Sequence, residues 1–133
     1  MYSNTKTSTL SSKQVKKVLQ FCAYWCHDNM GVNNRKRRDL TYSYGDDEKG
    51  FYGFYCPYVN HIRICTNECK TLGRLTSTFI HEYTHYLQSV RTKYASANAE
   101  FGYWNNPFEV EARKMEKKLN RYLLSGLRGK MSK

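Results

Sequence analysis

Residues 72–90 read LGRLTSTFIHEYTHYLQSV and combine a helical pattern with a group of chemically reactive side chains. Apolar and aromatic residues recur at a spacing of three or four, at Leu72, Leu75, Phe79, Tyr83, Tyr86, Leu87 and Val90. This spacing predicts an amphipathic helix with one face in the core. We expect Thr66 or Asn67 to cap its start. His81, Glu82 and His85 lie within the same helix.

These polar residues form an H-E-x-x-H motif, His81-Glu82-Tyr83-Thr84-His85. Four residues are slightly more than one helical turn, so the imidazoles of His81 and His85 project from one face and can bind one Zn²⁺. Glu82 is rotated by about 100° from His81. Its carboxylate can therefore reach a water molecule beside the metal rather than the metal itself, which is the position of a general base.

A catalytic zinc needs a third protein ligand. The chain has no His, Asp or Cys after the motif. Four carboxylates remain downstream: Glu100, Glu109, Glu111 and Glu116. Glu109 and Glu111 lie on opposite flanks of the next apolar stripe, so only one of them can face the motif. Glu109 has a structural alternative in a capping box with Asn106, and Glu111 has another as a solvated carboxylate. The residue pattern leaves this choice open.

The residues before the motif predict one helix and three strands. Ser11 and Gln14 form a capping box at the start of an amphipathic helix, and Gly31 suits the left-handed position after its end. Aromatic and β-branched residues then predict three short strands, at residues 39–45, 51–56 and 59–65. In the last strand, Ile62 and Ile64 point to the same side, which we expect to be the core face.

After the motif, a looser link is predicted over residues 93–105, and Asn106-Pro107 then begins another helix. The tail after Ser125 is expected to fray. One helix, three strands and two helices predict an α+β fold with a small, mainly antiparallel sheet. With 133 residues and 15.7 kDa, residues 1–133 are expected to be a single domain with basic, partly flexible termini.

The composition excludes several classes of protein. Hydrophobic residues make up 40% and aromatic residues 15%, which argues against disorder. No apolar run approaches the 18 or so residues of a membrane span. The polar N-terminus lacks the apolar block of a secretory signal, so we expect an intracellular, cytoplasmic protein. The five cysteines are an odd number, and we expect free thiols in a reducing compartment.

Two segments make the sequence resemble a known group of proteins. HEYTHYLQ (residues 81–88) and NPFEVEAR (residues 106–113) resemble small zincin-like zinc metallopeptidases of the gluzincin type, many of them encoded by bacteriophages. Residues 53–64 are similar to the strand pair that precedes the zinc helix in those proteins. The resemblance implies a minimal zincin fold and, if the chain is phage-encoded, the host cytoplasm. It also implies Glu109 as the third ligand, because the ligand glutamate of related minimal gluzincins stands three residues before an alanine, here Ala112. SprT-like proteases are more distantly similar and use a third histidine, which is absent here.

We therefore expect a zinc-dependent metallopeptidase in which His81, His85 and Glu109 hold the metal, with Glu111 as the alternative third ligand. Glu82 is expected to act as general base on a metal-activated water that hydrolyses the peptide bond. The oxyanion would need one further donor. Three residues are candidates for that donor: Tyr94, Tyr103 and Arg91. The peptide or protein substrate is expected to add a strand to the sheet at residues 59–65, taken as an edge strand.

The charge distribution supports an alternative. The net charge of +11 divides into +7 for residues 1–38, −3 for residues 39–112 and +7 for residues 113–133. Basic ends attract phosphate or acidic surfaces but do not specify a fold. The alternative is thus a non-catalytic zinc-containing scaffold that binds nucleic acid or protein through its basic ends. In either case weak contact with nucleic acid is expected, and the sequence does not indicate the oligomeric state.

Overall fold

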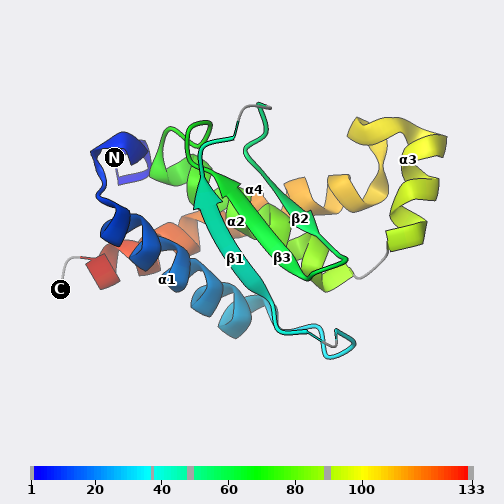
Figure 1. The fold of residues 1–133 in the computed structure, drawn as a ribbon, viewed down its shortest axis with the longest axis horizontal. Coiled ribbons are helices and arrows are strands. Elements are labelled where there is room, and N and C mark those ends of the chain that lie inside the picture. Colours follow the sequence, from blue (N-terminus) through cyan, green and yellow to red (C-terminus); the bar gives the residue numbers. More distant parts are fainter. Residues whose placement is uncertain (1, 37, 48–49, 89–90, 132–133) are drawn as a thin grey trace.

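The computed structural model describes residues 2–36, 38–47, 50–88 and 91–131, with the backbone alone described at residues 91 and 92. Two short 3₁₀ turns precede seven longer elements (Figure 1): α1 (Ser12–Met30), β1 (Thr41–Gly45), β2 (Gly53–Cys56), β3 (His61–Cys65), α2 (Leu72–Gln88), α3 (Arg91–Asn105) and α4 (Pro107–Met131). The predicted α+β class is confirmed. Val90 and the side chain of Arg91 lie outside the described residues.

The sheet is mixed rather than mainly antiparallel. Its strand order is β1-β3-β2, with β3 parallel to β1 and antiparallel to β2. The short turn between β2 and β3 forces that pair to be antiparallel. Since the chain also reverses between β1 and β2, β1 and β3 run in the same direction. The expectation that residues 59–65 form an edge strand is therefore wrong, because β3 is central and β2 lies at an edge.

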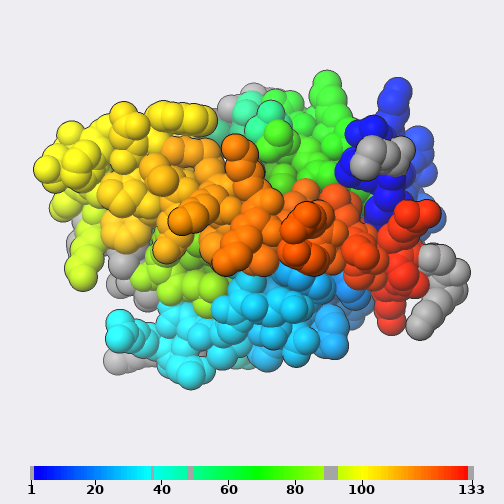
Figure 2. Space-filling model, turned by 180° about the vertical axis from the view of Figure 1, so that it is seen from behind, coloured from blue at the N-terminus to red at the C-terminus, as the bar shows by residue number. Residues whose placement is uncertain are grey.

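The core lies between one face of the sheet and the helices behind it (Figure 1). Ile62 and Ile64 are fully buried, which confirms the predicted core face of β3. α2 packs against both the sheet and α4, and α1 lies beside α4 on the far side of the molecule (Figure 2). The five cysteines are free thiols, as predicted, and four of them are buried. None of the helices in the described segments is long and apolar enough to cross a bilayer.

Two predicted helix starts are confirmed by their hydrogen bonds. The backbone N–H of Gln14 donates to Ser11 Oγ at 3.2 Å, and Ser11 N–H donates to Gln14 Oε1 at 2.8 Å, which is a complete capping box. Gly31, with φ of 91°, follows the end of α1. At the start of α4, Phe108 N–H donates to Asn106 Oδ1 at 3.0 Å. Asn106 is therefore the N-cap, as predicted.

Other predicted boundaries are wrong. α2 begins at Leu72, several residues after Thr66 and Asn67, and Thr71 is its cap because its Oγ1 accepts from Arg74 N–H at 3.2 Å. The link predicted over residues 93–105 belongs to α3, a helix with a kink at Gly102, where φ is 79°. None of the described α3 side chains is buried. α3 has no apolar stripe to bury, so sequence periodicity could not reveal it.

The C-terminal tail does not fray after Ser125, because α4 continues to Met131 and Leu127 is fully buried. We predict that Leu127→Ala lowers the free energy of unfolding by about 2–5 kcal/mol through lost burial and a residual cavity. Urea denaturation measures this change. The exposed Lys130→Ala is the control, with an expected change within about 0.5 kcal/mol. Equal effects of the two substitutions would mean that this part of α4 is not packed.

Candidate metal centre

Three side chains from two helices converge at one point. His81 and His85 project from α2, and Glu109 comes from the first turn of α4. His81 Nε2 lies 2.8 Å from Glu109 Oε1, and His85 Nε2 lies 3.1 Å from Glu109 Oε2. The three side chains are only 13%, 12% and 4% exposed. One ligand atom from each lies within 4.8 Å of the others, so the group could hold a metal ion.

Outer hydrogen bonds orient both imidazoles. His81 Nδ1 lies 2.5 Å from Glu116 Oε2, and His85 Nδ1 lies 2.7 Å from Gln88 Oε1. Each of these oxygens accepts a hydrogen bond, so each Nδ1 acts as donor and each Nε2 is the nitrogen presented toward Glu109. A partner on the second ring nitrogen is the usual companion of a metal-binding histidine. Glu116, one of the candidate third ligands, therefore lies behind His81 rather than among the converging atoms.

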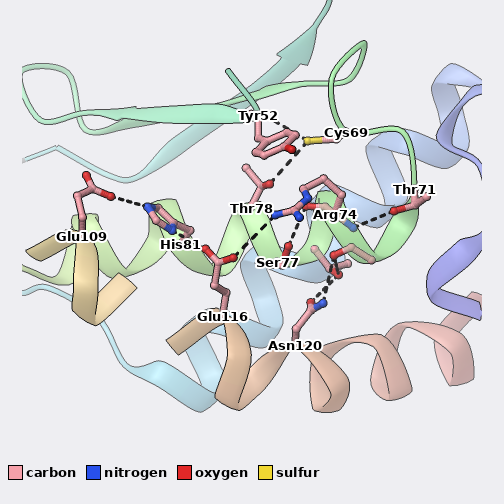
Figure 3. A network of polar contacts seen from close by, with 12 residues as sticks. Tyr52, Cys69, Thr71, Arg74, Ser77, Thr78, His81, Glu109, Glu116 and Asn120 are labelled. Atoms are coloured by element: carbon pink, nitrogen blue, oxygen red, sulfur yellow. Dashed lines mark hydrogen bonds and ion pairs between the residues drawn. The ribbon is translucent and has the colours of Figure 1, made fainter. Parts of the chain in front are cut away.

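Glu116 is itself held by a cation (Figure 3). Arg74 Nη1 lies 4.0 Å from Glu116 Oε1, and the Arg74 guanidinium stacks over the Tyr52 ring at 4.4 Å from its centroid. Further along α4, Asn120 binds α2 through Thr76 Oγ1 at 2.6 Å. These contacts join α4 to the part of α2 that precedes His81. They hold in place, relative to each other, the two helices that carry the three converging groups.

The two candidates that sequence reasoning could not separate have different surroundings. Glu109 is buried and contacts both histidines, whereas Glu111 is exposed and accepts a hydrogen bond from Gln88 Nε2 at 2.8 Å. The capping box of Asn106 and Glu109 does not form, because the Glu109 carboxylate points to the histidines and to the Tyr94 hydroxyl. Glu100 lies exposed on α3. Of the four downstream carboxylates, only Glu109 belongs to the converging group.

Glu82 lies beside this group and is 7% exposed. Burial raises the pKa of its carboxyl to about 6, although the neighbouring His81 and His85 lower it in part. A carboxyl with this pKa holds its proton weakly near neutral pH and can both accept and return one. Glu82 also lines the same cleft as the two histidines and Glu109.

The protonation of the group follows from its mutual contacts. Burial alone lowers the pKa of His81, but its hydrogen bonds to Glu109 and Glu116 outweigh burial and raise the pKa to about 10. The pKa of His85 is raised as well, chiefly through Glu109 against the effect of burial. Burial raises the pKa of Glu109, yet both histidines hold that pKa well below its usual range. Two imidazole nitrogens and one carboxylate are a donor set that suits Zn²⁺, so the residues fit this metal.

The group opens into a cleft of about 640 Å³ between β2 and α3. The lining is rich in phenylalanine and tyrosine and consists of Phe51, Gly53, Phe54, Tyr55, Pro57, Tyr58, His81, Glu82, His85, Gln88, Tyr94, Tyr103 and Glu109. The Tyr94 hydroxyl donates a hydrogen bond to Glu109 Oε2, and the Tyr94 ring stacks on Phe108 with the ring centroids 6.3 Å apart. Two of the three proposed oxyanion donors, Tyr94 and Tyr103, thus lie at the cleft.

Sequence reasoning missed the roles of Gln88 and Glu116. Both were detectable in principle, because Gln88 follows His85 by three residues and Glu116 follows Glu109 by seven, and each spacing keeps two side chains on one helix face. The aromatic residues of β2 could not be assigned to the cleft without the strand order. No protein-family model, curated protein or solved structure shows significant similarity to this chain.

Proposed function

We propose that the chain is a zinc-dependent peptidase of the H-E-x-x-H type, with His81, His85 and Glu109 as ligands and Glu82 as general base. One observation carries the proposal. The two Nε2 atoms and the Glu109 carboxylate converge in the lining of an open cleft, with a buried carboxyl of raised pKa next to them. A structural zinc would need neither the cleft nor this carboxyl.

Each polar group of the cleft has its own role in the proposed hydrolysis. Bound zinc supplies Lewis acidity toward the scissile carbonyl and lowers the pKa of a water ligand. Glu82 accepts the proton of the attacking water and returns it to the leaving amine. Tyr103 is available as a donor to the oxyanion, because it lines the cleft and a tyrosine hydroxyl is protonated at neutral pH. Tyr94 is the second donor within reach of the group, through its bond to Glu109.

The strand order moves the expected path of the substrate from β3 to β2. β2 replaces β3 as the edge strand and contributes Gly53, Phe54 and Tyr55 to the cleft wall. An extended peptide that lies along β2 would pass the converging group and place side chains against aromatic rings. Among the described lining residues, the ligands, Glu82 and the tyrosines are the only ionisable groups. We therefore expect bulky apolar residues on either side of the cleaved bond.

Cleavage of a mixed peptide library by the zinc-loaded protein tests this function, with the products sequenced by mass spectrometry. We expect cuts flanked by aromatic or large aliphatic residues, no cuts after removal of the metal by a chelator, and recovery when zinc is returned. A protein that holds one zinc and cleaves no member of the library would contradict the peptidase and favour the non-catalytic scaffold.

Metal binding is predicted to release protons. In the metal-free protein, His81 holds its proton up to a pH of about 10, and zinc must displace it to reach Nε2. The apparent zinc affinity should therefore rise as the pH rises from 6 to 8, by up to about tenfold per pH unit for each proton released. Calorimetric titrations in buffers of different ionisation enthalpy count these protons. An affinity independent of pH would contradict a protonated His81 in the metal-free protein.

A further inference from the structure

A row of positive side chains follows the outer face of α4. Its members are Lys114, Lys117, Lys118, Arg121 and Arg128, all exposed, and we call them the α4 basic stripe. Figure 2 shows α4, in orange to red, crossing that side of the molecule. The stripe exists because residues 107–131 form one continuous helix, so that cations scattered along the sequence share a surface.

The stripe is opposite the buried face of the same helix. At 100° per residue, its five positions fall within an arc of roughly 100°, centred about half a turn from Ala112, Leu123 and Leu127. Those three residues are fully buried. With a rise of 1.5 Å per residue, the stripe from Lys114 to Arg128 is about 21 Å long.

The arrangement is unfavourable for the helix itself. Lys114, Lys117, Lys118 and Arg121 are related by spacings of three and four residues, at which like charges repel and destabilise a helix. A solvated helix face typically alternates its charges, but residues 117–133 contain no Asp or Glu. Within the described part of the chain, no carboxylate lies within 4.0 Å of the three lysine ammonium groups.

The helix dipole does not account for the centre of the stripe. Cations are favourable in the last turn of a helix, and this explains Arg128 and Lys130. Lys114, Lys117 and Lys118 lie in the middle of α4, where the dipole has no such effect. A cluster that costs stability in the isolated protein is expected where a negatively charged partner offsets the repulsion.

We propose that the α4 basic stripe binds the phosphodiester backbone of a nucleic acid. One strand of a duplex carries a negative charge about every 3.4 Å of its axis, so a stripe of about 21 Å spans roughly six phosphates. An anionic membrane fits less well, because a helix that lies on a bilayer exposes an apolar face, whereas Ala112, Leu123 and Leu127 of α4 are buried in the core. The contacts are to phosphates, so binding has little sequence preference.

This binding does not depend on the proposed peptidase activity. Glu109 projects from α4 toward α2, on the buried side of the helix, whereas the stripe faces outward. A nucleic acid on the stripe therefore leaves the metal group accessible. The Glu82→Gln variant, which the peptidase proposal renders inactive, is expected to bind nucleic acid as tightly as the wild type does.

Fluorescence anisotropy with a labelled 20-base-pair duplex, measured over a range of salt concentrations, tests the proposal. The stripe variant is Lys114→Gln, Lys117→Gln, Lys118→Gln. The matched control is Lys6→Gln, Lys70→Gln, Lys93→Gln, which removes the same charge from exposed positions elsewhere. The wild-type plot of log affinity against log salt is expected to have a slope of about −4, the slope of the stripe variant to be less steep by about three, and that of the control to stay within one of the wild type.

Thermal unfolding of the two variants separates binding from folding. The stripe variant should melt no lower than the wild type, because its substitutions remove repulsive pairs. Duplex DNA and duplex RNA are compared to identify the source of the phosphates, and stripe-dependent binding of either supports the proposal. Four results would each overturn the proposal. Two concern the duplexes: equal losses in the stripe variant and the control, or no binding to either duplex at 50 mM salt. The other two are a lower melting temperature of the stripe variant and tighter stripe-dependent binding to phosphatidylserine vesicles.

Discussion

The Glu82→Gln variant is expected to retain one zinc per chain and to hydrolyse peptide about 10² to 10⁴ times more slowly than the wild type. Glutamine keeps the size and the hydrogen-bonding capacity of the side chain but cannot accept a proton from water. The carboxyl is buried next to two ligands without being one of the converging atoms, so its loss should leave the metal in place. The measurements are kcat/KM on a peptide that the wild type cleaves and the zinc content of the same sample.

Glu100→Gln is the control for this substitution, because Glu100 is an exposed carboxylate on α3. We expect its kcat/KM to stay within about twofold of the wild type. A Glu82→Gln variant that remains active would show that another group takes the proton. A variant that loses its zinc would show that Glu82 is a ligand, and the roles of Glu82 and Glu109 would then have to be exchanged.

Glu109→Ala is expected to weaken zinc binding by more than the 10- to 100-fold loss that is typical when an outer partner of a ligand is removed. The Glu109 carboxylate contacts Nε2 of both histidines, so its removal leaves a site with two ligands. Zinc affinity is measured by competition with a coloured chelator. Glu111→Ala, two residues further along the same turn, is the matched control and should change the affinity by less than tenfold.

Glu116→Ala tests, in the same assay, a residue that orients a ligand histidine without being a ligand itself. Glu116 touches His81 only through Nδ1, so we expect an affinity loss of about 10- to 100-fold, between those of the other two variants. A larger loss in Glu111→Ala than in Glu109→Ala would contradict the assignment of the third ligand. Equal losses in all three variants would indicate a general effect on folding, which circular dichroism of the metal-free proteins would reveal.

The local features of the fold and site were predictable from the sequence. Ser11 with Gln14, and Asn106 before Pro107, depend on contacts within a few residues, and both helix starts are as expected. His81 and His85 share a face because of helical spacing alone. Glu109 and Glu111 could not be separated in this way, because the choice depends on how α4 is rotated against α2.

Features that depend on distant contacts were harder to predict. The position of β3 between β1 and β2 follows from pairing between residues about 20 apart, to which a hydrophobic pattern is insensitive. The sequence predicts a frayed tail at the end of α4, because the glycines and cations there hide the burial of Leu127 against the core. α3 escaped prediction for a different reason, since its described side chains bury nothing and leave no periodic signal.

The central claim is that one zinc ion is bound by His81, His85 and Glu109. Anomalous diffraction at the zinc absorption edge, from crystals of protein purified without added metal, tests it most directly. We expect one peak per chain, about 2.0–2.2 Å from Nε2 of both histidines and from a Glu109 carboxylate oxygen. No peak at these residues, or a peak coordinated by Glu111, Glu116 or the cysteines in place of Glu109, would contradict the account.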